Sequence, residues 1–233
     1  EDKKFHRVMY RPAFAVQARE LTTQQSILQN QIEKLGDHMF KHGSMVIPGE
    51  TTYDLNHFSI KLTSFTGTLA NFTDTVITGG TSGVTATVKS VSATDGTDPD
   101  TLFVKYSNSG TDNVSASFTD GETITSSAST GETAVVSSSH TGCAAFIDAG
   151  TYYINGFFVE VDSQSLILDK YTNTPDYRVG LTVTENFITS TDDTTLLDNA
   201  TGSSNANATG AHRFKITLTL AKLSLTSTAD GSF

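Results

Sequence analysis

The sequence predicts a mainly β protein, in which an N-terminal amphipathic, coiled-coil-like helix is followed by small β-barrel or sandwich modules. Apolar residues recur at helical spacing only within residues 1–43. Beyond these residues, apolar and polar side chains alternate with the period of two that is typical of strands. Only 36% of the residues are hydrophobic and 18 are Gly, which favours many short strands joined by tight turns.

The changes in pattern divide the chain into consecutive parts. We expect an N-terminal arm and oligomerisation helix at residues 1–43, linker strands at 44–64, a β module with a duplicated hairpin at 65–140, and a second β module at 141–233 with a long loop at 189–211.

The helix carries an apolar seam whose positions step by four and three residues, which is the a/d pattern of a coiled coil. The residues expected at an oligomer interface are Leu21, Gln25, Leu28, Ile32, Leu35 and Met39. Burying the five large apolar side chains is worth on the order of 10 kcal/mol per chain before entropy is subtracted, so this face is expected to be covered. The alternative is that the helix lies on the β core of its own chain, because Ile27 and Phe40 widen the apolar face.

The ends of the helix have candidate capping residues. Thr22 and Gln25 have the spacing of a capping box, although the helix can also begin further upstream, near Pro12. Gly43 follows Lys41 and His42 and is expected at the position just after the helix.

A repeat lies within the first β module. The order of Phe, Ile, Gly, Ala and Val residues in 72–88 returns in 118–136 at an offset of 46 to 48 residues, with Thr130-Gly131 in the second copy matching Ser82-Gly83 in the first. Two copies of such a hairpin can close on each other and bury faces that neither hides alone.

The second β module begins with a hairpin signal. Residues 150–161 read as two strands around an Asn155-Gly156 turn. Further strands are expected at 165–168, 177–184 and 214–220. The polar residues 189–211 form the long loop, with a short helical turn expected at Leu196 and Leu197.

Charge and cysteine content exclude several classes of partner. The formal net charge is -10, which disfavours nucleic acid and anionic membrane surfaces. The apolar runs are shorter than the ~20 residues needed to span a bilayer, so no membrane insertion is expected. Cys143 is the single cysteine and has no partner for an intrachain disulfide.

The sequence contains no recognisable catalytic signature, and we expect no enzymatic activity, cofactor or metal. Three polar groups are candidate ligand sets: His38 with His42; Asp95, Asp98 and Asp100; and Asp192, Asp193 and Asp198. The histidines lack a neighbouring catalytic Glu, and the first acidic group lacks the Gly and bidentate Glu of an EF-hand. All three groups are expected to be turn, loop or helix-end residues.

Four blocks near the N-terminus resemble a known family. They are residues 5–12 (FHRVMYRP), 15–22 (AVQARELT), 27–32 (ILQNQI) and 43–49 (GSMVIPG). In this order they are similar to the N-terminal portion of tail and baseplate structural proteins from contractile-tailed bacteriophages, especially T4-like phages of cyanobacteria. Segments between residues 168 and 216 are similar to a stretch of the same proteins, although relatives commonly have Pro and Asp where this chain has Thr209 and His212.

This resemblance implies a structural component of a virion, in the tail, baseplate or tail-fibre attachment apparatus, that is assembled in the host cytoplasm. Its partners would be other tail or baseplate proteins and further copies of itself. The seam residues favour two strands, whereas the resemblance to fibre-like proteins favours a homotrimer, so a trimer is expected ahead of a dimer. The alternative is a carbohydrate-binding receptor adhesin with Tyr106, Tyr152 or Tyr153 as stacking platforms.

Overall fold

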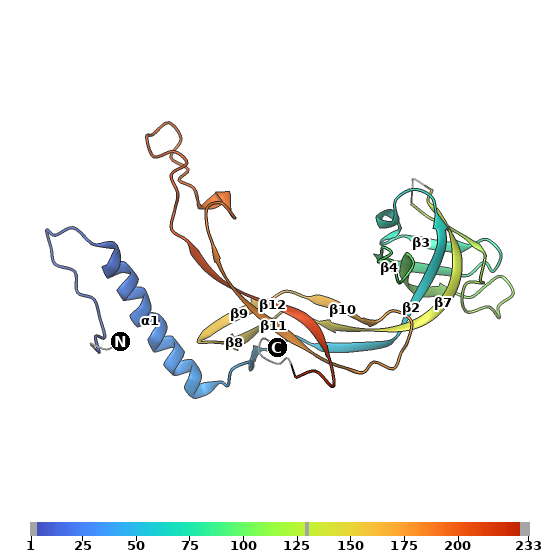
Figure 1. Cartoon of the computed structure of the whole chain (residues 1–233), viewed down its shortest axis with the longest axis horizontal. Helices are drawn as coiled ribbons and strands as arrows, with labels where there is room; N and C mark the ends of the chain where they lie inside the picture. Colours follow the sequence, from blue (N-terminus) through green and yellow to red (C-terminus); the bar gives the residue numbers. More distant parts are fainter. Residues whose placement is uncertain (1–3, 129–130, 229–233) are drawn as a thin grey trace.

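The computed structural model of the chain describes residues 4–128 and 131–228, and shows an elongated molecule (Figure 1). Helix α1 (Ala18–Met39) lies at one end, and a compact group of strands lies at the other. A long shaft of strands connects them. The prediction of a mainly β chain with one N-terminal helix is confirmed.

Helix α1 begins earlier than the Thr22 capping box predicts. Glu20 closes a capping box with Gln17, whose backbone N–H donates to Glu20 Oε2 at 2.9 Å. Thr22 is already inside the helix, because its hydroxyl donates to the Ala18 carbonyl at 3.1 Å. The helix ends at Met39, so Gly43 is not the residue that terminates it. Gly43 instead lies in the following turn with φ +81°.

The strands, in chain order, are β1 (Met45–Ile47), β2 (Thr51–Phe65), β3 (Val76–Gly79), β4 (Thr85–Ser92), β5 (Thr101–Asn108), β6 (Thr123–Ser126), β7 (Thr133–Ile147), β8 (Gly150–Ile154), β9 (Phe157–Val161), β10 (Gln164–Asp169), β11 (Tyr177–Ile188) and β12 (Arg213–Ser224). Two short 3-10 turns are η1 (Leu69–Phe72) and η2 (Thr194–Leu196). All the strand pairings are antiparallel.

Six strands form a closed ring of pairings in the order β7-β2-β5-β4-β3-β6, and β6 pairs again with β7. We call this ring the barrel. The two sequence repeats supply the hairpins β3–β4 and β6–β7, which meet where β3 pairs with β6. Gly80 N–H donates to the Thr123 carbonyl at 2.9 Å, and Ser127 N–H donates to the Val76 carbonyl at 2.8 Å. These two bonds are equivalent, so a local two-fold symmetry relates the repeats. Thr130 of the second repeat lies outside the described residues.

The interior of the barrel is filled by apolar side chains from both repeats and from β2. Ile77 and Val88 of the first repeat and Ile124 and Val136 of the second are fully buried. Ile60 of β2 belongs to the same core. The segment 44–64, expected as linker strands, therefore belongs to two parts of the molecule. The second half of β2 is a barrel strand, whereas the first half of β2 lies in the shaft.

The shaft has two layers. The inner layer contains the sheet β1-β8-β9 and the shaft halves of β2 and β7 with β10. The outer layer is the hairpin β11–β12, whose apolar face packs on Ile147, Tyr152 and Val159. The Asn155-Gly156 turn joins β8 to β9 with φ of +48° and +84°, which is the backbone that the sequence predicts there.

The hairpin β11–β12 extends beyond the shaft as a projecting ribbon (Figure 1). Its pairing runs from Tyr177–Ser224 to Ile188–Arg213. The loop at 189–211 is at its tip and contains η2, close to the short turn expected at Leu196 and Leu197.

Candidate functional site

The seam of α1 is exposed along its whole length. The relative exposures are 56% for Leu21, 56% for Leu28, 47% for Ile32, 62% for Leu35 and 65% for Met39, and Gln25 is exposed as well. Their spacing of three and four residues puts them on one face of the helix. The structure thus groups all six predicted interface residues on a surface that this chain leaves uncovered.

A different face of α1 contacts the chain's own β structure. Gln29 Nε2 donates to the Gly156 carbonyl at 2.8 Å, and Gly36 lies against the ring of Tyr153. At about 100° per residue, Gln29 and Gly36 are turned about 80° and about 60° from the middle of the seam. The helix thus contacts the shaft of its own chain through Gln29, Gly36 and Phe40, whereas the seam residues stay exposed.

Gly36 permits the closest approach between helix and shaft. A Cβ at this position would lie 2.4 Å from Tyr153 Cε2. The Tyr153 hydroxyl lies 2.8 Å from Asp37 Oδ1 and 2.9 Å from the Glu33 carbonyl, and donates its single proton to one of them at a time. Burial, followed by the neighbouring Asp37 carboxylate, raises the pKa of Tyr153 to about 12. The Phe40 ring packs 5.8 Å from the Tyr153 ring and completes this contact.

Sequence analysis identifies the seam but misses this contact. From the sequence alone, Gly36 indicates only that the helix is less stable by about 1 kcal/mol than it would be with Ala at this position. The partner ring is more than 100 residues away in the chain, and no local pattern connects them. The one available signal is the presence of a Gly near the end of an otherwise regular helix, which often has a packing reason.

The N-terminal arm, residues 4–16, covers a third face of α1. The Tyr10 hydroxyl donates to Gln24 Oε1 at 2.6 Å, and the Arg11 guanidinium lies 4.3 Å from the centre of the Phe14 ring. Phe5 lines a hollow with Thr22 and other helix residues on this side. The arm therefore leaves the seam open.

The shaft has an open apolar groove of about 600 Å³ beside the base of α1. Its lining residues are His42, Gly43, Ser44, Met45, Thr51, Ile147, Tyr152, Ile154, Gly180, Leu181, Val183, Leu218 and Leu220. They come from both layers of the shaft and from the turn that follows α1. The groove thus begins a few residues after Met39, where the seam ends.

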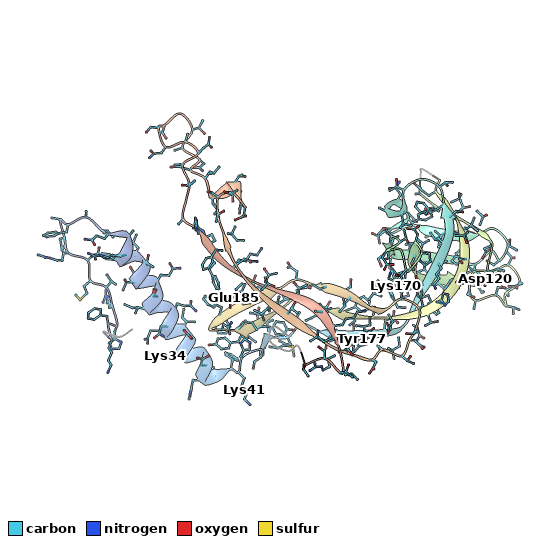
Figure 2. All side chains as sticks on the ribbon, in the orientation of Figure 1. Lys34, Lys41, Asp120, Lys170, Tyr177 and Glu185 are labelled. Carbon is cyan, nitrogen blue, oxygen red and sulfur yellow. The ribbon has the colours of Figure 1, made fainter. Side chains whose placement is uncertain are left out.

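At least one residue of each candidate ligand set has a structural role. His42 Nδ1 accepts from the Asn155 N–H at 3.3 Å, whereas His38 is exposed on the helix. Asp98 lies 2.9 Å from Lys170 Nζ at the junction of shaft and barrel (Figure 2). Asp193 caps η2 through the Thr195 N–H at 2.9 Å. Within residues 4–128 and 131–228, no three His, Cys, Asp or Glu side chains are grouped as a metal ion would require.

The tyrosines proposed as sugar-stacking platforms do not present open faces. Tyr152 and Tyr153 are 7% and 1% exposed. Tyr106 is partly buried between the rings of Phe58 and Phe118. An adhesin site built on these three residues is therefore wrong, because their rings are occupied by packing.

The chain is an elongated, mainly β protein with an N-terminal helix on which several large apolar side chains are exposed. A family model for a domain of unknown function, DUF4815, matches residues 111–231. This is about half of the chain, and the chain belongs to the DUF4815 family. Neither a curated protein nor a solved structure matches it. In the described residues, no helix has the length and apolarity to cross a membrane.

Proposed function

We propose that the chain is a structural component of a phage tail, baseplate or fibre-attachment apparatus, which self-associates through the α1 seam. A homotrimer is favoured over a dimer. Its place would be the virion, with assembly in the host cytoplasm among other tail and baseplate proteins. The α1 helices would form a short coiled coil from which the shafts and barrels extend.

The exposed seam is the observation that carries this proposal. Leu28, Leu35 and Met39 are each more than half exposed, and covering the whole seam is worth on the order of 5 kcal/mol per chain before entropic costs. Exposed apolar surfaces of this kind mark interaction sites. The helix cannot close the seam on its own shaft, because the Gly36 contact with Tyr153 fixes another face toward the shaft.

The position of the resemblance supports the same role. Two of the four signature blocks, residues 15–22 and 27–32, lie on α1 or directly before it, and the block at 43–49 contains β1. The signature thus coincides with the helix, the turn after it and the edge of the shaft. This is the part of the molecule that a tail protein would use for anchoring.

Solution mass tests the self-association. Light scattering at several concentrations should give a trimer, or else a dimer, for the unmodified chain, and a monomer for Leu28→Asp, which places a carboxylate in the seam. Asn30→Asp is the matched control, since it adds the same charge on the face opposite the seam, and it should retain the oligomer. A Leu28→Asp chain that keeps the parent mass would contradict the proposal.

The virion role has a separate test. Antibodies against the barrel should label the tail or baseplate of phage particles that encode the chain, as seen by immunogold electron microscopy. Labelling restricted to the capsid, or the chain's absence from purified particles, would reject the virion role and leave the self-association standing.

A further inference from the structure

The outer layer of the shaft is narrower than the inner layer. Strand β12 lies over β10, where Leu220 N–H donates to Gln164 Oε1 at 2.8 Å. Tyr177 and Val179 of β11 then pack on Cys143 and Ala145 of β7, and among the described residues β11 pairs with no strand other than β12. The groove is the space that a third outer segment would fill, since Thr51 and its strand partner Ile147 both line it.

An exposed apolar strip continues this groove along the inner layer. Met45, Tyr53 and Leu55 are 52%, 62% and 47% exposed. Tyr53 shares the face of Thr51, because side chains of a strand alternate with a period of two, and Leu55 follows at the start of the irregular pairing between Asp54 and His57. Strand β2 pairs with β7 on one side here, whereas β5 reaches it only from Phe58 onward. Residues 51–57 therefore also present an unpaired edge among the described strands.

The seam by itself offers less area than a stable contact between copies requires. Its five apolar residues are 47–65% exposed, whereas a standard protein interface buries about 800 Å² per partner and involves about 20–30 residues on each side. An oligomer held through α1 therefore needs additional surface. The groove and its strip could supply this additional surface, since the groove begins a few residues beyond Met39.

The charge of the surface indicates which partner fits it. The chain carries a net charge of -10, so copies repel each other except where they meet through neutral surface. None of the groove-lining residues is Asp, Glu, Lys or Arg, and the seam residues are uncharged as well. A strongly acidic or basic partner would find no complementary charge in either place.

We propose that a second copy of the chain covers this groove in the oligomer and buries Tyr53 and Leu55. The contact between copies then runs without interruption from the α1 seam to the shaft. This inference rests on the proposed self-association, and it names the surface that completes it.

Fluorescence tests the proposal directly, because the chain contains no Trp. Tyr53→Trp would be its sole tryptophan. As the concentration rises from monomer to oligomer, its emission should shift to shorter wavelength and its quenching by acrylamide should fall several-fold. Val114→Trp is the matched control: Val114 is 82% exposed on the barrel, away from the groove, and its quenching should stay constant.

Each outcome separates the two proposals. If the chain oligomerises while Tyr53→Trp remains fully quenchable, the groove proposal is overturned and the seam proposal stands. If the tryptophan is protected in an oligomer that Leu28→Asp does not dissociate, the groove is supported and the seam is rejected. A chain that stays monomeric at every concentration overturns both.

A second variant tests the same contact without introducing a tryptophan, which could itself change the local packing. Leu55→Asp should weaken association about 10- to 100-fold, the usual cost of losing a large side chain from the centre of an interface. Val114→Asp should leave association unchanged. Equal association of the two variants would overturn the groove contact.

Discussion

Glu122 shows how a single buried side chain joins the two repeats of the barrel. Glu122 is 4% exposed. Its carboxylate accepts hydrogen bonds from the backbone N–H groups of Thr81 at 3.0 Å, Ser82 at 2.9 Å and Thr119 at 2.7 Å. Burial alone would raise the pKa of Glu122, but the hydrogen bonds from Ser82, Thr119 and Thr81 together lower it. The carboxylate thus holds the β3–β4 turn against the start of the second repeat.

Glu122→Gln should destabilise the chain by about 1–3 kcal/mol, because an amide nitrogen would face backbone donors that need an acceptor. The folded-state pKa lies below the ordinary value of 4.5. The contribution of Glu122 is therefore complete above that value and is lost as the pH falls below it. Urea unfolding at pH 7 and pH 3 checks this: the difference between parent and variant should shrink at pH 3. An equal difference at both values would contradict this role.

Gly36 is a residue whose small size has a specific cause, because the Tyr153 ring occupies the space that a side chain would need. Gly36→Leu would collide with the Tyr153 ring and detach the end of α1 from β8. The pKa of Tyr153 should then fall from about 12 toward the ordinary value of 10, because the ring leaves its buried position beside Asp37. Ultraviolet titration of the tyrosines measures this change. Lys34→Leu introduces the same side chain on the exposed helix surface (Figure 2) and should leave the titration unaltered.

Among the elements, those defined by local pattern are the ones the sequence predicts. The α1 seam, the Asn155-Gly156 hairpin and the two repeats are each visible in the spacing of side chains. The spacing of side chains does not show that β2 runs continuously through the shaft and the barrel. Its register shifts between Asp54 and His57 and again near Leu62, so the alternation breaks and the strand reads as separate pieces.

The loop at the tip of the projecting ribbon differs from the strands of the shaft and the barrel, because no residue in 189–211 is buried. Replacing residues 189–212 with Asn-Gly would join the paired Ile188 and Arg213 through a tight turn. The melting temperature should change by no more than about 2 °C, since none of the removed residues 189–211 is buried. Calorimetry measures it. A large loss of stability would show that the loop contributes to folding.

At the scale of the whole molecule, elongation is the feature that composition and periodicity do not predict. It arises from pairing between distant segments, such as β2 with β7 and β10 with β7. The junction of shaft and barrel is fixed by similar long-range contacts: Lys61 Nζ lies 3.8 Å from the centre of the Tyr171 ring, and the Tyr171 hydroxyl lies 2.8 Å from Thr101 Oγ1. Pattern within a segment cannot identify such partners.

X-ray scattering of the Leu28→Asp monomer tests this shape. A compact chain of this length would have a radius of gyration of about 17 Å. The separation of α1 from the barrel (Figure 1) should give a clearly larger value, and the distance distribution should have a long tail. A value near that of a compact chain would mean that the shaft folds back in solution.

Strands β2 and β7 each extend for 15 residues, from the barrel into the shaft. A pull on the barrel against an anchored α1 would therefore be directed largely along these strands. Their cross-strand hydrogen bonds lie perpendicular to the strands, so such a load shears many of them at once rather than opening them one by one. The β2–β7 ladder would therefore resist tension along the direction of these two strands.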